Sequence, residues 1–387
     1  MRVILNGWFW GQTGTGSGQY LSHLLEHLTA LAPDNDYVLA LWQPSGALAC
    51  EEARLPAGCQ ALLLTTPFDR VSENLSKVWF EQVAFARACR RAGANIAHVP
   101  YWGSPLFPTV PTVATIHDLF PLLMPAYRGG AAACLYTRLV AASARRAAGA
   151  ITVSQASQQE IVTHLRLPAT RVRVTPEAAP DDMQRAESAQ VRMAVRKYGL
   201  PEKFLLYLGG FDARKDVAGL LAAFALLAPR EPPELNLVIA GRLPDVDSSF
   251  TPDPRRIALQ LGIAAQVQFP GWIDEADKAA LYTAARVFVF PSRGEGFGLP
   301  VLEALACGTP VITTRTSSLP EVAGGAGILV SPGDTGELAE AMGMLWHDDR
   351  LWWKLHEEAL ARAALFSWRK TAQATLDAYT AALAQPP

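Results

Sequence analysis

The feature that most constrains the fold is a strand, a glycine-rich loop and a helix in direct succession within residues 286–310. Val287–Phe290 is a continuous apolar run, which is typical of a strand buried on both faces in a parallel sheet. Three glycines alternate with other residues in the loop that follows: Gly294, Gly296 and Gly298. A helix is predicted from Pro300 to just before Gly308, because proline favours the first turn of a helix and glycine the position after its end.

Two carboxylates accompany this stretch, Glu295 in the loop and Glu303 about one turn inside the helix. Backbone amides at a helix N-terminus attract anions, so the loop and helix could hold a phosphate. Because like charges repel, we expect the two acids to bind sugar hydroxyls, which donate hydrogen bonds to carboxylates, and not the phosphate itself. The alternative is a pair of surface acids without a role.

The same succession recurs along the chain, which predicts an α/β fold with mostly parallel sheets and right-handed crossovers. Strands are predicted in the first half at Val3–Leu5, Tyr37–Trp42, Ala61–Leu64, Ile96–Val99, Thr112–Ile116 and Ala150–Val153. Strands are predicted in the second half at Phe204–Leu208, Leu237–Ala240, Gln266–Phe269, Val287–Phe290, Val311–Thr313 and Gly327–Val330. Helices are predicted at about 76–91, 132–147, 155–165, 217–228, 275–284 and 334–347.

Two domains are expected, because 387 residues are many for a single core. The alternation of strands and helices pauses near Thr175, and a polar segment continues to Gln190. A boundary at about residue 180 follows, with one domain at 1–180 and a second beginning at 181.

The glycines after the first strand do not form a dinucleotide fingerprint. The third glycine of the fingerprint would have to stand at position 19 or 21, which are Gln19 and Leu21. The next strand also ends without the acid that binds a ribose, so a Rossmann-type oxidoreductase is disfavoured. Two interpretations remain, a close approach of the backbone to a ligand or a simple tight turn, and both concern Gly16, Ser17 and Gly18.

Composition argues against several classes of protein. The five cysteines are scattered and form no Cys-x-x-Cys pair, which disfavours a disulfide framework and a structural zinc site and favours a reducing compartment. No apolar run reaches eighteen residues and no signal peptide is recognisable, so a cytoplasmic protein is expected. The net charge is −2 and no basic stripe is present, so nucleic acid is not expected as a partner.

A pair of cations follows the predicted strand Phe204–Leu208, at the sheet edge where α/β proteins place their sites. Arg214 and Lys215 come after a strand and a glycine pair, Gly209 and Gly210. An arginine fork and a lysine point charge can together neutralise a diphosphate, although a solvated surface pair would look the same in sequence.

Histidines occupy equivalent places in the first half. His117, followed by Asp118, comes directly after the strand Thr112–Ile116, and His98 stands in the strand Ile96–Val99. Each histidine could donate to a substrate hydroxyl or stabilise a charged transition state, or could be structural. Neither a serine-nucleophile frame nor a metal-ligand signature accompanies them.

Taken together, these motifs resemble the group 1, or family 4, retaining glycosyltransferases of GT-B fold. The stretch PSRGEGFGLPVLEALACGTPVI resembles the family's signature of two glutamates separated by seven residues, here Glu295 and Glu303. Segments 15–20 and 115–119 resemble its glycine loop and its His-Asp element. The Gly-Gly and Arg-Lys pairs resemble its phosphate clamp, and Phe366-Ser-Trp368 resembles its closing segment. The resemblance covers nearly the whole chain.

The resemblance implies two Rossmann-like parallel-sheet domains that face a deep cleft. Residues 1–180 would bind the acceptor, 181–365 would bind the donor, and 366–387 would form a C-terminal helix that packs back on the N-terminal domain. It also implies transfer of a sugar, with retention of configuration, from a nucleotide-diphosphate donor to a hydroxyl of a glycan or lipid-linked acceptor. No cofactor and no metal are expected.

The resemblance assigns roles to three groups of residues. The catalytic residues would be His117, Glu295, Arg214 and Lys215. The donor-binding residues would be Gly209, Gly210, Gly241, Gly271, Trp272, Gly296, Phe297, Gly298, Leu299 and Glu303. The residues on the acceptor side of the cleft would be Gly16, Ser17, Gly18, His98 and Asp118.

Similarity to bacterial polysaccharide mannosyltransferases favours GDP-mannose as the donor, with a UDP-sugar of glucose type as the runner-up. A nucleotide-sugar 2-epimerase and a non-catalytic nucleotide-sugar-binding regulator are the two rival functions. Two positions depart from the family pattern: Glu177 stands where the family usually has asparagine in Pro-Asn-Gly, and Gln19 stands where a basic residue is common. Peripheral contact with the inner face of a membrane stays open, since Arg138 and Arg145 lie on one predicted helical face, although both could simply be solvated.

Overall fold

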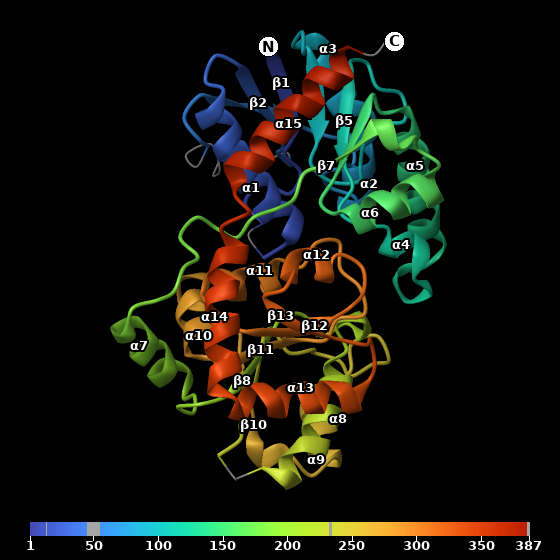
Figure 1. Ribbon diagram of the computed structural model, residues 1–387. Coiled ribbons are helices and arrows are strands. Elements are labelled where there is room, and N and C mark those ends of the chain that lie inside the picture. Colours follow the sequence, from blue (N-terminus) through green and yellow to red (C-terminus); the bar gives the residue numbers. More distant parts are fainter. Residues whose placement is uncertain (13, 45–54, 232–233, 385–387) are drawn as a thin grey trace. The chain divides into compact units, whose positions relative to one another are not determined.

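The computed structural model describes residues 1–12, 14–44, 55–231 and 234–384 (Figure 1). The chain forms two compact units. Unit 1 comprises Met1–Glu177 together with Trp368–Pro387, and unit 2 comprises Ala178–Ser367. Cys50 lies outside the described residues.

Unit 1 is built on a seven-stranded sheet in which every neighbouring pair is parallel. In spatial order the strands are β3 (Cys59–Leu64), β2 (Asp36–Trp42), β1 (Arg2–Asn6), β4 (Ile96–Val99), β5 (Thr112–Thr115), β6 (Gly149–Thr152) and β7 (Val172–Val174). The central strand β1 pairs with β2 through Val3 and Tyr37 and with β4 through Val3 and Ile96. The residues of β1 that follow Arg2 and all the residues of β4 are buried, as expected for the central strands of a parallel sheet.

The helices of unit 1 depart from the prediction in three places. They are α1 (Gly16–Leu31), α2 (Glu73–Trp79), α3 (Phe85–Arg91), α4 (Phe120–Leu123), α5 (Ala131–Arg146), α6 (Gln155–Glu160) and α15 (Trp368–Leu383). Helix α4 was not predicted, and the helix expected at 155–165 ends at Glu160, where a π-helical turn, Ile161–Leu165, follows. The helix expected at 76–91 is interrupted by a π-helical turn, Phe80–Ala84, between α2 and α3. The wider turn brings residues five apart onto the same side, which lets both Phe80 and Phe85 be fully buried.

Unit 2 is built on a six-stranded sheet that is also entirely parallel. In spatial order the strands are β10 (Val267–Gly271), β9 (Leu237–Ala240), β8 (Leu205–Leu208), β11 (Val287–Phe290), β12 (Val311–Thr314) and β13 (Gly327–Val330). Numbered within the unit this is the order 3-2-1-4-5-6 of a doubly wound sheet, which places ligands at the carboxyl ends of its central strands. The prediction of an α/β fold with parallel sheets is confirmed for both units.

The helices of unit 2 include three short ones that the sequence did not predict. They are α7 (Ser188–Tyr198), α8 (Val217–Leu227), α9 (Pro254–Gln260), α10 (Lys278–Ala284), α11 (Leu299–Ala306), α12 (Leu319–Ala323), α13 (Thr335–His347) and α14 (Asp349–Ala363). The unpredicted helices are α7, whose only buried residue is Ala194, α9, which has two buried residues, and α12, which is five residues long. Such short helices with little apolar surface carry almost no periodic signal.

The C-terminal helix α15 belongs to unit 1, where it packs against α1, β5 and β6 (Figure 1). Trp368 is buried and stacks on His23 of α1, with 5.1 Å between ring centroids. Three alanines of α15 are buried along the same helix: Ala372, Ala378 and Ala382. Within the described part of the chain, none of the helices combines the length and the apolar character needed to span a membrane.

Candidate active site

In unit 2, glycines meet at the carboxyl ends of three adjacent strands, β8, β9 and β10. Gly241 has φ +137°, and its N–H donates to the carbonyl of Gly271 over 2.8 Å. A Cβ on Gly241 would lie 2.2 Å from the carbonyl oxygen of Gly209. Only glycine permits this conformation and this approach, so the structure brings three of the predicted donor-binding positions into one backbone cluster.

The two cations after β8 converge on the loop after β11. Arg214 Nη1 lies 2.7 Å from Glu295 Oε2, and Lys215 Nζ lies 2.8 Å from Glu295 Oε1. Arg214 also donates to the carbonyl of Gly294 over 2.5 Å. Because β8 and β11 are neighbours in the sheet, residues eighty apart in sequence become direct partners.

This ion cluster is largely shielded from solvent. The side chains of Arg214, Lys215 and Glu295 are 12%, 13% and 10% exposed. Burial acts to raise the pKa of Glu295, but Lys215 and Arg214 outweigh it and hold the pKa of this carboxyl below its usual value. The acid that we expected to face a sugar is therefore ionised and engaged by the cations that we expected to face a phosphate.

Hydroxyl groups that the sequence analysis missed hold the glycine-rich loop in place. Ser317 Oγ accepts from the N–H of Glu295 over 2.8 Å. Ser318 Oγ donates to the carbonyls of Glu295 and Phe297, at 2.9 and 2.6 Å. Ser318 is fully buried and Ser317 has φ +46°, so this turn is specifically shaped around the loop. In the sequence, only the position of Ser317 and Ser318 after the end of a predicted strand could have suggested that they hold the loop.

The second glutamate has a different environment. Glu303 on α11 is 5% exposed, and its Oε2 accepts from the hydroxyl of Tyr282 on α10 over 2.8 Å. Burial raises the pKa of Glu303 above its usual value. Helix α11 begins after Gly298, which has φ +113°, so Leu299 is its first residue.

The remaining donor-binding residues predicted in unit 2 lie in the same loops. The hydroxyl of Tyr207 donates to the carbonyl of Gly210, at the end of β8. Phe297 is buried edge-on against Phe366, with 5.8 Å between centroids. Trp272 follows β10 and is 55% exposed, and Gly296 lies between Glu295 and Phe297 in the loop after β11.

In unit 1, His117 follows β5 and is held from both ring nitrogens. Its Nδ1 lies 3.0 Å from Glu177 Oε1, and its Nε2 lies 3.2 Å from the carbonyl oxygen of Pro100. Burial acts to lower the pKa of His117, but the carboxylate of Glu177 outweighs it, so the pKa lies above its usual value. Glu177 is one of the two positions that depart from the family pattern, and sequence reasoning gave it no partner.

His98 requires a correction. We expected it on the acceptor side of a cleft, but it is fully buried in β4. Its Nδ1 bonds to Tyr379 Oη over 2.7 Å and its Nε2 to Thr115 Oγ1 over 2.8 Å. Burial, together with the nearby His117, lowers the pKa of His98 to about 3, so the ring is neutral. His98 is a core residue that ties the C-terminal helix to the sheet.

The glycine loop of unit 1 forms the start of α1. Thr15 caps the helix, and its Oγ1 accepts from the N–H of Gly18 over 3.1 Å. A Cβ on Gly18 would lie 2.2 Å from the carbonyl oxygen of Gln12, whereas a Cβ on Gly16 would meet nothing within 4 Å. Gly16 is exposed and Ser17 partly exposed. The close approach of Gly18 thus accounts for the tight turn, and Gly16 borders open space.

Asp118 shapes the backbone after His117. Its Oδ1 accepts from the N–H of Phe120 over 3.0 Å, at the start of α4. The hydroxyl of Ser157 donates to the carbonyl of His117 over 3.0 Å. These two bonds fix the segment that carries the histidine.

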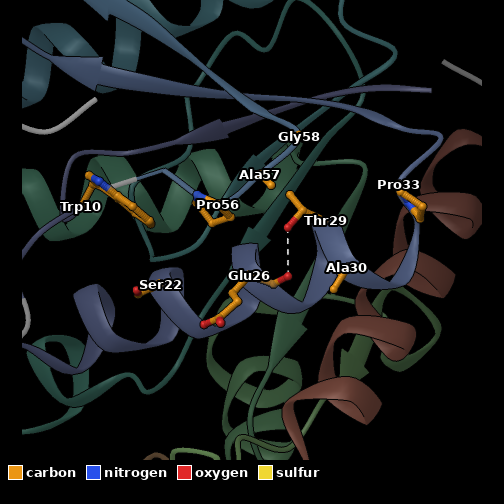
Figure 2. Close-up of a pocket in the computed structure, with 9 residues that line it drawn as sticks. All are labelled: Trp10, Ser22, Glu26, Thr29, Ala30, Pro33, Pro56, Ala57 and Gly58. Carbon is orange, nitrogen blue, oxygen red and sulfur yellow. Dashed lines mark hydrogen bonds between the residues drawn. The ribbon is translucent and has the colours of Figure 1, made fainter. Parts of the chain in front are cut away.

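A separate cavity of about 680 Å³ lies beside α1 (Figure 2). Its lining residues are Trp10, Ser22, Glu26, Thr29, Ala30, Pro33, Pro56, Ala57 and Gly58. It contains none of the predicted site residues and one carboxylate, Glu26, so it offers no constellation for chemistry.

Comparison with known proteins identifies the family. Residues 14–181 match the sequence profile described as Glycosyltransferase Family 4, and residues 193–363 match that of Glycosyl transferases group 1. The chain is 31% identical to the O-antigen chain mannosyltransferase B of Escherichia coli over 268 residues, which is 69% of either chain. The chain belongs to the group 1, or family 4, glycosyltransferases. It is also 30% identical to the serotype-specific mannosyltransferase WbdA of Escherichia coli over 70% of its own length, but spans only 33% of that protein.

Solved structures agree with this assignment at the level of the fold. The sucrose-phosphate synthase of Thermosynechococcus elongatus superimposes with a TM-score of 0.78 at 23% identity, covering 98% of both chains. The glycosyltransferase therefore has a GT-B fold, as the sequence predicted. Among its described residues, no group of three or more histidine, cysteine or acidic side chains is arranged to hold a metal ion.

Proposed function

We propose that this glycosyltransferase transfers mannose from GDP-mannose, with retention of anomeric configuration, to a hydroxyl of a glycan or lipid-linked glycan. The observation that carries the proposal is the convergence of Arg214 and Lys215 on Glu295 at the carboxyl edge of the unit 2 sheet. This is where a doubly wound sheet of this order binds nucleotides. Mannose is supported by the relatives, whose names describe mannosyltransferases.

The two cations would neutralise the leaving diphosphate. Arg214 offers a planar fork of donors and Lys215 a point charge, and both are largely desolvated, which strengthens their interaction with an anion. Amides at the N-terminus of α11, around Gly298 and Leu299, would add to this stabilisation. Transfer would therefore proceed without a metal, since protein cations supply the charge that the leaving group needs.

Glu295 would act twice at this site. Before donor binding it compensates the two cations, as its two ion pairs indicate. When a diphosphate takes over those cations, the carboxylate would be released to accept from hydroxyls of the sugar. Glu303 would accept from the ribose hydroxyls with its second oxygen, while Tyr282 holds the first.

Unit 1 would receive the acceptor, with His117 as the residue that acts on it. The exposed start of α1, with Gly16 and Ser17, would approach the acceptor through its backbone. A peripheral contact with the cytoplasmic face of a membrane is supported by the exposed arginines Arg138 and Arg145 on α5, although Arg145 also donates to the carbonyl of Leu165 over 2.8 Å.

Thermal unfolding in the presence of a panel of nucleotides and nucleotide sugars tests the donor. A ligand that binds only the folded state raises the melting midpoint. At a hundred times its dissociation constant it adds about 2.7 kcal/mol to the free energy of unfolding. We expect GDP and GDP-mannose to stabilise the protein more than UDP and UDP-glucose. The opposite order would overturn the choice of GDP-mannose and favour a UDP-sugar as the donor. Stabilisation without turnover in the presence of acceptors would instead favour a regulator.

A further inference from the structure

The hydrogen bonds of His117 determine its protonation state. A carboxylate and a backbone carbonyl are both acceptors, and the two ring nitrogens face one of each, at Glu177 Oε1 and Pro100 O. Both nitrogens must therefore carry hydrogen for both bonds to form. The ring is an imidazolium, with a fixed positive charge paired to the carboxylate of Glu177.

The groups around the ring favour this charge. Asp118 follows directly in sequence and adds a second negative group. Tyr20 of α1 lies edge-on to the ring, with 4.7 Å between centroids, and burial raises its pKa so that it stays neutral. His98 of β4 is also neutral, because its pKa lies near 3. Glu177 is thus the decisive opposite charge in direct contact.

Glu177 is itself rigidly held. Its side chain is 5% exposed. The N–H of Thr175 donates to the carbonyl of Thr152 in β6 over 2.8 Å, and the hydroxyl of Thr371 in α15 donates to the carbonyl of Pro176 over 2.6 Å. The segment that carries Glu177 is therefore fastened from both the sheet and the C-terminal helix.

We propose that Glu177 is a positioning residue, which holds His117 by Nδ1 in the imidazolium form and leaves its Nε2–H as the donor to a substrate oxygen. The bond from Nε2 to Pro100 is the longer of the two, at 3.2 Å, and its acceptor is uncharged, so it is the one that a substrate oxygen can replace. The proposal rests on the proposed function, in which His117 acts on the sugar or the acceptor.

The rate of sugar transfer should depend on the protonation of His117. A charged donor is lost when the ring deprotonates, so transfer falls as pH rises through the pKa of His117. With Glu177 present that pKa is raised above the usual value for histidine, and the alkaline limb lies at higher pH. Removing the carboxylate removes the main stabilising charge, so the alkaline limb moves to lower pH.

The variants Glu177→Gln and Glu177→Asp provide the test, with Glu73→Gln, an exposed acid of α2, as the control. The titration of the His117 Cε1–H resonance is followed by NMR, with His117→Ala used to assign it, and transfer is measured as kcat/KM against pH. In Glu177→Gln we expect the His117 midpoint and the alkaline limb to fall by about one to three pH units. Glu177→Asp restores most of the shift, and the control changes neither.

Two results would overturn the proposal. One is a His117 midpoint that is the same in Glu177→Gln as in the wild type, provided that melting shows the variant to be folded. The other is a midpoint that falls while the pH profile of transfer stays unchanged. If the wild-type protein transfers no sugar from any nucleotide sugar, the proposed function fails, yet the NMR titration still decides whether Glu177 sets the charge of His117.

Discussion

Replacing Glu295 with glutamine separates the two roles assigned to this residue. The side chain keeps its shape but loses the charge that two cations share. Lys215 then loses its carboxylate partner and Arg214 its closest one, since Asp212 Oδ1 lies 3.5 Å from Arg214 Nε, while the two cations remain 13% and 12% exposed. The variant should therefore be less stable when empty and should respond more strongly to an anion.

The magnitude follows from the burial of the cluster. Removing one partner of a buried ion pair costs about 3 to 5 kcal/mol, because the remaining charge is left uncompensated. Unit 2 spans about 190 residues, and for a domain of this size 1 kcal/mol corresponds to about 2–4 °C in Tm. We expect the Tm of unit 2 to fall by about 6–20 °C in Glu295→Gln.

Differential scanning calorimetry with and without GDP gives the assay. A diphosphate replaces the lost anion in the variant, whereas in the wild type it must compete with Glu295 and sit beside it. GDP should therefore raise the Tm of the variant by more degrees than that of the wild type. Asp274→Asn is the control, because Asp274 pairs with Lys197 at an exposed position, where an ion pair contributes about 1 kcal/mol or less. A variant that melts like the wild type, or that gains no more than the wild type from GDP, would refute the reasoning.

Three further predictions concern stability. Gly241→Ala should destabilise unit 2 by at least about 2 kcal/mol in denaturant unfolding, because the new methyl group would meet the carbonyl of Gly209 in a strained backbone conformation; a wild-type midpoint would contradict the close approach. Tyr282→Phe should cost about 1 to 3 kcal/mol, since buried Glu303 loses its hydrogen-bond donor, and an unchanged urea midpoint would rule that bond out. Burial raises the pKa of Glu81 to about 7 from 4.5, so the folded state holds this proton more tightly. The stability of unit 1 should thus fall by about 3 kcal/mol as pH rises from about 4.5 to about 7, and Glu81→Gln should flatten this dependence; the same slope in the variant would count against the shift.

The fold was predictable from the sequence because its central strands are buried on both faces. Continuous apolar runs such as Val287–Phe290 coincide with the observed strand β11. The π-helical turn at Phe80–Ala84 was not predictable, because its residues fit an ordinary helix until the burial of both Phe80 and Phe85 is known. Helix α7 was missed because it buries a single residue.

The candidate site was predictable as a set of residues but not as a set of contacts. Glycine loops, cations and acids after strand ends could be found by position alone. The pairing of Lys215 with Glu295 depends on β8 and β11 being neighbours, which sequence order does not reveal. The pairing of His117 with Glu177 likewise joins the ends of β5 and β7, which flank β6. The prediction for His98 failed because a histidine near the end of a strand can face either a ligand or the core, and sequence alone does not distinguish the two. In the structure its side chain is buried in the core.

The central claim is that this glycosyltransferase moves a sugar from a nucleotide diphosphate through the Arg214, Lys215 and Glu295 cluster. The most direct measurement is the release of GDP from GDP-mannose with and without a glycan acceptor, together with the anomeric configuration of the product by NMR. We predict release that depends on the acceptor, a product with retained configuration, and loss of release in Glu295→Ala. Equal release without acceptor, an inverted product, or wild-type transfer by Glu295→Ala would contradict the account.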